Sequence, residues 1–182
     1  QGYEECEDPS VFVKFKVKNQ ENTYFLVWTT TPWTLISNVA LAVHNDHDYV
    51  KVKTGDEYLI LAKARLGELK SEYEIAAEYK GKDLVGTDYE QMFKFVKPDK
   101  KAHYVCAADF VTLEDGTGIV HIAPAFGEDD YQLGVKNGLP VIQPVNSRCE
   151  YTDEVTPWKG VFVKDADPSI QKFMKENGIL YK

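Results

Sequence analysis

Apolar and polar residues alternate along residues 11–18 of the chain. Every second position from Val11 to Val17 is valine or phenylalanine, and lysine dominates the positions between them. Successive side chains of a β-strand point to opposite faces, so this pattern predicts a half-buried strand. A polar turn over residues 19–22 leads to a second β-prone run over residues 23–28. The two segments together predict a hairpin.

A helical spacing follows in the first half of the chain. Leu66, Leu69 and Tyr73 are spaced i, i+3 and i+7, which places them on one face of a helix. We therefore expect a helix over residues 62–72.

Helix-end signals mark two further helices. Residues 128–136 begin with three acidic residues, which favour the positive end of the helix dipole, and Gly138 suits the left-handed turn that ends a helix. In the last segment, Asp167 is expected to cap a helix, with Pro168 at its first position and Gly178 at its end.

The remaining apolar runs are short and bounded by turn residues, as strands are. Many short strands with interspersed helices predict an α+β fold with a β-barrel-like core and surrounding helices. The other strands are expected over residues 39–43, 49–53, 58–61, 74–79, 103–107, 118–122 and 141–145.

Length and charge narrow the class of protein. The 182 residues, 43% of them hydrophobic, suffice for a core without disulfides or metals, and we expect residues 1–182 to form a single domain. No apolar stretch approaches the roughly 20 residues of a membrane helix, so no membrane partner is expected. The net charge of −8 argues against a general nucleic-acid coat, because such binding depends on neutralising phosphates.

The cysteines and the first residue add two expectations. Cys6, Cys106 and Cys149 lie far apart and form no C-x-x-C pair, which weakens a zinc or redox interpretation. A reduced, cytoplasmic setting is expected. The chain begins at Gln1 without a methionine, and we expect it to be a fragment or a processed product.

Residues 28–34 read Trp-Thr-Thr-Thr-Pro-Trp-Thr and follow a predicted strand directly. Threonine hydroxyls donate and accept hydrogen bonds, so a loop of them suits a ribose, a carbonyl or a water. Trp33 could stack on a base or on an amino-acid side chain. The structural alternative is a strand end with β-branched residues and a packed tryptophan.

A histidine and an acidic cluster occur near residue 120. His121 falls where the predicted strand calls for an apolar residue, so it is either a core histidine or a pocket residue. The Gly-x-Gly before it is no dinucleotide fingerprint, because a strand follows. Of the acids at 128–130, helix-end electrostatics explains two, and one could hold a ligand ammonium. Residues 44–48 carry histidine and aspartate, but they read as a polar turn rather than a metal site.

Taken together, two long segments resemble the editing domain (connective polypeptide 1) of isoleucyl-tRNA synthetase. They are WTTTPWTLISNVALAV and GTGIVHIAPAFGEDDY, and KGKDLVGTDYE and GVFVKDADPSI are similar to the same family. The related valyl enzymes typically carry lysine where His121 stands, and leucyl enzymes have a different threonine-rich segment. One departure is Ile36, where family members often have proline.

The resemblance implies a proofreading hydrolase inserted in a larger class I synthetase. It would hydrolyse valine esterified to the isoleucine tRNA, with valyl-adenylate as a second candidate substrate, and would exclude isoleucine by pocket size. A missing methylene in an apolar pocket is worth only about 1–3 kcal/mol, a magnitude for which discrimination in this synthetase family is itself a standard example. The aminoacylation signatures of the parent are absent here, so no aminoacylation is expected.

The resemblance also implies roles for single residues. Asp130 would hold the substrate α-ammonium, and His121 would line the side-chain pocket and limit its size. The threonines would bind the terminal adenosine, the ester and the attacking water, while Trp33 and Asn38 would shape the adenosine side. The expected catalytic residues are Asp130, Thr30, Thr31 and His121, and the expected substrate-binding residues are Thr29, Trp33, Thr34 and Asn38.

No cofactor and no metal are expected. The expected partners are the 3′-terminal aminoacylated adenosine of tRNA(Ile), its valine moiety and the rest of the parent synthetase in cis. Two alternatives stay open: a freestanding deacylase acting in trans, and a non-catalytic module that only orients the tRNA acceptor end or connects domains. Because of its charge, the isolated chain is expected to bind whole tRNA poorly.

Overall fold

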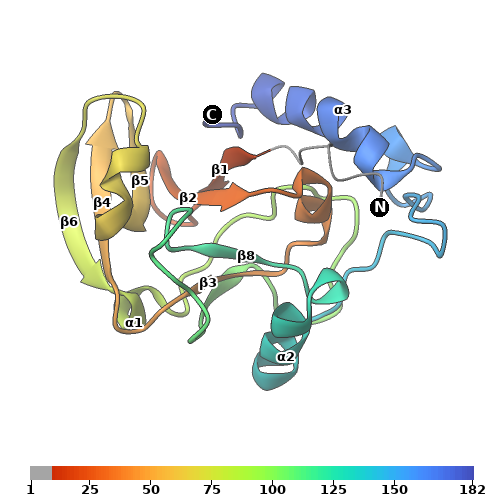
Figure 1. The fold of residues 1–182 in the computed structure, drawn as a ribbon, viewed down its shortest axis with the longest axis horizontal. Helices are drawn as coiled ribbons and strands as arrows, with labels where there is room; N and C mark the ends of the chain where they lie inside the picture. Colours follow the sequence, from red (N-terminus) through yellow and green to blue (C-terminus); the bar gives the residue numbers. More distant parts are fainter. Residues whose placement is uncertain (1–9) are drawn as a thin grey trace.

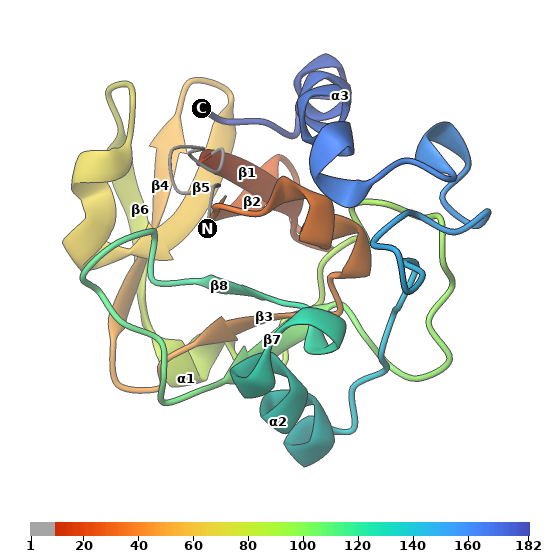
Figure 2. The same ribbon diagram turned by 45° about the vertical axis from the view of Figure 1, so that its right-hand side comes forward.

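The computed structural model describes residues 10–182 and contains two β-sheets (Figures 1 and 2). The larger sheet has the order β1-β2-β5-β4-β6. Its first two strands form the predicted antiparallel hairpin, with Val11 opposite Thr29. The strands are β1 (Val11–Lys16), β2 (Thr23–Thr29), β4 (Asp48–Thr54), β5 (Glu57–Ala62) and β6 (Glu74–Lys80).

The smaller sheet is central to the site described below. It consists of β7 (Tyr104–Ala107), β3 (Ala40–Val43) and β8 (Val120–Ile122), in that order. The middle strand, β3, runs parallel to β7 and antiparallel to β8, which places Leu41 opposite His121.

Helices lie on opposite sides of these sheets. Figures 1 and 2 show α3 next to β1 and β2, and α2 beside the smaller sheet. Short helical turns fill the connections. The helical segments are η1 (Pro32–Ser37), η2 (Lys63–Glu68), α1 (Gly81–Leu84), η3 (Pro124–Phe126), α2 (Glu128–Asn137), η4 (Thr156–Trp158) and α3 (Val163–Glu176).

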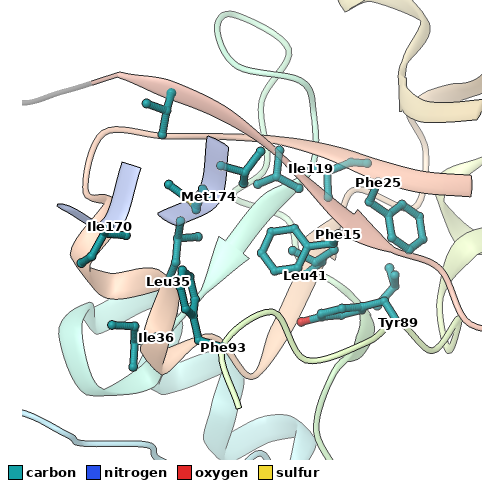
Figure 3. Close-up of a cluster of buried hydrophobic side chains, with 14 of the residues drawn as sticks. Phe15, Phe25, Leu35, Ile36, Leu41, Tyr89, Phe93, Ile119, Ile170 and Met174 are labelled. Atoms are coloured by element: carbon teal, nitrogen blue, oxygen red, sulfur yellow. The ribbon is translucent and has the colours of Figure 1, made fainter. Parts of the chain in front are cut away.

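The main core contains side chains from β1 and β2, from the smaller sheet and from α3. The predicted apolar face of β1 is confirmed, since Val13 and Phe15 are almost fully buried. Figure 3 shows Phe15, Phe25 and Tyr89 on one side of this core, with Ile170 and Met174 on the other. One smaller cluster lies under α2, and another is formed by side chains of β2, β4 and β5 together with Tyr181.

The α+β class is confirmed, and the core is barrel-like only in a loose sense. Among the described residues the core is built from two separate sheets, which do not close into one barrel. The predicted hairpin and most of the other predicted strands are present. Gly138 and Gly178 adopt left-handed φ angles of 69° and 70° just past their helices, as expected.

The predicted helix over 62–72 is wrong. Ala62 belongs to β5 and pairs with Tyr49, and only the short 3-10 segment η2 follows it. Arg65 has non-helical angles there, and its side chain reaches the Gly116 carbonyl at 2.9 Å. Gly67 further weakens a helix, since glycine loses about 1 kcal/mol relative to alanine in a helix interior. Sheet pairing and a side-chain contact therefore override the apolar spacing.

The predicted start of the last helix is also wrong. Helix α3 begins at Val163, so Asp167 lies buried inside it and is not its cap. Pro168 is inside the helix as well. The turn before it is ordered by the amide of Val163, which donates to the Cys149 carbonyl at 2.8 Å. A tertiary contact of this kind leaves no signal in the local sequence.

No strand forms over 141–145; the structure has only an isolated bridge between Val145 and Tyr151. Pro140 precedes this segment and Pro144 lies within it, and proline cannot donate to a strand ladder. Cys6 lies outside the described residues, while Cys106 and Cys149 are free thiols. None of the helices among residues 10–182 has the length and apolarity needed to cross a membrane.

Candidate active site

The threonine-rich loop is shaped by its own hydroxyls. Strand β2 ends at Thr29, and Pro32 opens η1. The amide of Thr31 donates to Thr29 Oγ1 at 3.0 Å, and the Thr34 hydroxyl donates to the Thr31 carbonyl at 2.9 Å. Thr31 Oγ1 and Thr34 Oγ1 are 3.0 Å apart. These bonds fold the loop back on itself at the end of the strand.

A second segment, from β8 to α2, faces this loop. Pro124 ends the strand region and begins η3, and Gly127 precedes α2. Asp130 lies in the first turn of α2, where its Oδ2 accepts a hydrogen bond from the Ala123 amide at 2.9 Å. Its Oδ1 makes no hydrogen bond within residues 10–182 and remains available to a ligand.

Between the two segments lies a cavity of about 370 Å³. Six of the eight predicted site residues form part of its wall, although they come from distant parts of the sequence. They are Thr29, Thr30, Thr31, Thr34, His121 and Asp130. The far wall is formed by residues 110–120, including Phe110, Thr112 and Asp115.

His121 is held by both ring nitrogens. Its Nε2 is 2.9 Å from Thr34 Oγ1, and its Nδ1 is 2.8 Å from the side-chain nitrogen of Asn38. Burial lowers the pKa of His121 to about 4, so the ring is neutral at pH 7. A ring whose two nitrogens both make hydrogen bonds is held in place, because any movement would break one of these bonds.

Asp130 is a carboxylate in a partly apolar setting. Burial raises its pKa above the usual value, the Ala123 amide opposes this rise, and the neighbouring charge of Asp129 adds to it. A desolvated carboxylate gains much from a cationic partner, since charge-assisted hydrogen bonds are stronger than neutral ones. The site can therefore bind an ammonium group at Oδ1.

Two predicted site residues lie outside the cavity wall. The Trp33 ring packs edge-on against Phe126 at a centroid distance of 4.9 Å, and the Trp33 carbonyl accepts a hydrogen bond from Tyr151 at 2.8 Å. Asn38 is buried behind His121. Their predicted part in shaping the adenosine side stays a prediction.

Sequence reasoning missed the far wall and the residues behind His121. Residues 110–116 read as an ordinary turn, and no local pattern distinguishes Phe110 from a surface aromatic residue.

The turn at 44–48 brings His44 and His47 into a stack with ring centroids 4.2 Å apart. Within the described part of the chain, no three or more His, Cys, Asp and Glu side chains are grouped so that they could hold a metal ion.

Comparison with known proteins identifies the family of this chain. The family model described as "Leucyl-tRNA synthetase, editing domain" matches residues 8–177. The chain belongs to this synthetase editing-domain family. The expected membership, drawn from the two long sequence motifs, is confirmed.

Individual proteins and solved structures are also similar to this editing domain. Isoleucine–tRNA ligase of Clostridium acetobutylicum is 62% identical over 182 residues, which is 100% of this chain and 18% of that protein. The chain thus spans about a fifth of that relative's length. Among solved structures, GlLeuRS-CP1 aligns with a TM-score of 0.75 at 17% identity, over 96% of this chain and 98% of that one. The P. knowlesi cytosolic leucyl-tRNA synthetase editing domain aligns with a TM-score of 0.69 at 13% identity, over 94% and 95%. These structures share the fold.

Proposed function

We propose that this domain hydrolyses valine from misacylated tRNA(Ile) and that it does so in cis within a cytoplasmic isoleucyl-tRNA synthetase. The observation that carries the proposal is the single cavity that joins the threonine loop, His121 and Asp130. Its volume of about 370 Å³ suits one aminoacylated adenosine, because small-ligand sites occupy roughly 300–1,000 Å³. The net charge of −8 is compatible with such a site, which receives only the end of the tRNA.

Asp130 anchors the substrate by its amino group. Its Oδ2 is held by the Ala123 amide, so Oδ1 can accept from the α-ammonium without losing its orientation. The ester carbonyl is bonded to the same carbon as the ammonium. Fixing the ammonium therefore also limits where the carbonyl can lie.

His121 supplies the size limit. Isoleucine is one methylene larger than valine, and a rigid pocket resists that extra volume by about 1–3 kcal/mol. The two hydrogen bonds of the His121 ring, to Thr34 and Asn38, supply this rigidity. Valine is accepted on this account and isoleucine is excluded.

The threonines position the water. Thr30 is exposed and Thr31 is half-buried, and both border the cavity. The water oxygen attacks the ester carbon, the bond from that carbon to the ribose oxygen breaks, and the proton lost by water ends on the ribose oxygen. The neighbouring ribose hydroxyl of the substrate can pass this proton. An aminoacyl ester is already activated, so positioning at high effective concentration suffices for catalysis.

The deciding experiment measures deacylation of valyl-tRNA(Ile) and isoleucyl-tRNA(Ile) by the chain. Wild type should hydrolyse the first and spare the second. Asp130→Ala should slow valyl-tRNA hydrolysis at least about tenfold, as expected for a lost charged hydrogen bond. Asp129→Ala is the matched control, because this neighbouring acid is exposed and lies outside the cavity wall.

Two results would contradict the proposal. No hydrolysis above background, together with binding of adenosine analogues, would favour a non-catalytic module. Equal losses in the two aspartate variants would remove the special role of Asp130. Chelators should leave the rate unchanged, and inhibition by a chelator would refute the metal-free mechanism.

A further inference from the structure

Tyr89, in the segment between α1 and β7, contacts Asn38, which in turn contacts His121 in the wall of the cavity. It is fully buried, and its ring contacts Phe15 and Phe25 with edge-to-face geometry (Figure 3). Its hydroxyl donates to Asn38 Oδ1 at 2.5 Å. Burial raises the pKa of Tyr89 well above its usual range, so the hydroxyl keeps its proton. The ring packs the core, while the hydroxyl makes a separate, directed contact.

The amide of Asn38 has a fixed orientation. Its nitrogen donates to the Ala40 carbonyl at 2.9 Å, and a carbonyl oxygen can only accept. The other end of the amide is therefore the oxygen, which accepts from Tyr89. His103 holds the backbone of the same residue, since its Nε2 lies 3.0 Å from the Asn38 carbonyl. Both the amide and the backbone of Asn38 are thus held.

The orientation of this amide decides which His121 nitrogen carries the proton. The amide nitrogen is a donor, so Nδ1 of His121 must accept. The ring is neutral, and its proton therefore lies on Nε2, which donates to Thr34 Oγ1. With that lone pair occupied, the Thr34 hydroxyl directs its own proton to the Thr31 carbonyl. Each group in this series therefore donates to the next. Tyr89 donates to Asn38, Asn38 to His121, His121 to Thr34, and Thr34 to the Thr31 carbonyl.

We propose that Tyr89 is a positioning residue: its hydroxyl holds Asn38 so that His121 adopts the Nε2–H tautomer and orients Thr34 in the cavity wall. Without the hydroxyl, Asn38 Oδ1 would be a buried acceptor without a partner, which is costly. The amide would then be held only through its nitrogen, by the Ala40 carbonyl, and a shift of the amide to relieve this cost would displace the donor of His121 Nδ1. The contribution to deacylation rests on the function proposed above, whereas the effect on the tautomer does not.

The first test is spectroscopic and needs no activity. Long-range ¹H–¹⁵N correlations of histidine-labelled chain report which ring nitrogen is protonated. Wild-type His121 should give the Nε2–H form alone, and Tyr89→Phe, which keeps the ring contacts, should give a mixture of tautomers. Tyr181→Phe is the matched control, because it removes another buried hydroxyl, one that accepts from the Lys70 amide far from the cavity. A single unchanged tautomer in Tyr89→Phe would overturn the proposal.

A reversed variant keeps the test decisive if Tyr89→Phe fails to fold. Asn38→Asp replaces the amide donor by a carboxylate, which can only accept. His121 should then protonate Nδ1, so its spectrum should show the opposite tautomer. Retention of the Nε2–H form would show that residue 38 does not set the tautomer, and the proposal would fall.

The second test is kinetic. Tyr89→Phe should lower kcat for valyl-tRNA deacylation by about 10- to 100-fold, the scale of small misplacements in active sites, and leave KM nearly unchanged, because Asp130 still binds the ammonium. In an Asn38→Ala background the same change should have no further effect, as expected for residues that act through one another. An equal fall in kcat in both backgrounds, or a rise in KM with kcat unchanged, would refute the proposal that Tyr89 acts through Asn38 and His121. If wild type shows no deacylation, the proposed function fails, and the tautomer test still decides this inference.

Discussion

Gly127 lies directly against the carboxyl group of Asp130. A Cβ at Gly127 would be 3.2 Å from Asp130 Cγ and 3.3 Å from its Oδ1. The backbone of Gly127 is extended, with φ −158° and ψ 140°, so any residue could adopt its conformation. Glycine is therefore needed here for space, and the space it leaves is occupied by the carboxylate that we propose binds the substrate.

Gly127→Ala should consequently weaken deacylation while the fold persists. The added methyl group would push the Asp130 carboxylate by a few tenths of an ångström, and we expect kcat/KM to fall by about 3- to 10-fold, mainly through KM. Gly67→Ala is the control, because a Cβ there meets nothing within 4 Å and the backbone angle is ordinary. Equal activity of Gly127→Ala and wild type in steady-state assays would show that the carboxylate position is not critical.

The raised pKa of Asp130 predicts an acid limb in the activity profile. Ammonium binding needs the ionised carboxylate, so kcat/KM should fall as the pH drops through a pKa above the ordinary aspartate value near 3.9. Asp129→Asn should shift this limb to lower pH, because the charge of Asp129 contributes to the rise. Glu128→Gln should leave the limb in place. A shift of the same size in both variants would assign the effect to net charge rather than to Asp129.

The alternating pattern of residues 11–18 and the glycine ends of α2 and α3 predicted their structures well, because local backbone geometry decides them. The same holds for the threonine loop, which Pro32 separates from its strand. The start of α3 could not be predicted in this way. The amide of Val163 binds the Cys149 carbonyl, and such a contact depends on the packed fold.

The sequence predicted only some of the residues that line the cavity. His121 and Asp130 were found by family resemblance, and the structure brings both to one wall with the threonines. Tyr89 lies in the segment KGKDLVGTDYE, which resembles the family, but nothing in that segment indicates its role, since a tyrosine in an apolar core is ordinary until its hydroxyl partner is known. The pairing of Tyr89 with Asn38 spans 51 positions of the chain, and no local pattern encodes it.

His121→Ala should relax the discrimination between amino acids. Removing the ring enlarges the pocket where the extra methylene of isoleucine would lie, so hydrolysis of correctly charged isoleucyl-tRNA(Ile) should rise relative to valyl-tRNA(Ile). The ratio of the two rates separates this effect from any general loss caused by freeing Thr34. His44→Ala removes a half-buried histidine of the turn at residues 44–48, outside the cavity wall, and it should leave the ratio unchanged. An unchanged ratio in His121→Ala would reject the steric role.

The lowered pKa of His121 predicts a loss of stability in acid. The pKa of His121 is about 4 in the folded chain, against about 6.5 for an unperturbed histidine, so between these values the unfolded chain binds a proton that the folded chain does not. The free energy of unfolding should therefore fall as pH drops from 6.5 towards 4, by up to about 3 kcal/mol from this residue. His47 and His103 act in the same direction. Denaturant titrations of His121→Gln should show a shallower slope than wild type over this window, and identical slopes would contradict the assignment.

Replacing Gly118 should damage the fold, because its backbone angle and its surroundings both oppose a side chain. Its φ is +80°, and a Cβ there would lie 2.5 Å from the Cβ of Ala62 at the end of β5. The left-handed angle alone costs an alanine about 1–2 kcal/mol, and overpacking adds about 1–3 kcal/mol. Gly118→Ala should thus lower the free energy of unfolding by about 2–5 kcal/mol.

Gly55→Ala separates the two causes. Gly55 has a φ of +62° with nothing within 4 Å of a Cβ, so it should show the backbone cost alone. The difference between the two variants in urea unfolding then measures the overpacking around Gly118, in which the contact with Ala62 is the tightest. Gly118 also lines the cavity, and its carbonyl accepts a hydrogen bond from Tyr49. Activity of Gly118→Ala should therefore fall even under conditions where it remains folded. Equal destabilisation in the two variants would mean that the β5 end can move aside, and that the wall of the cavity is more yielding than its contacts indicate.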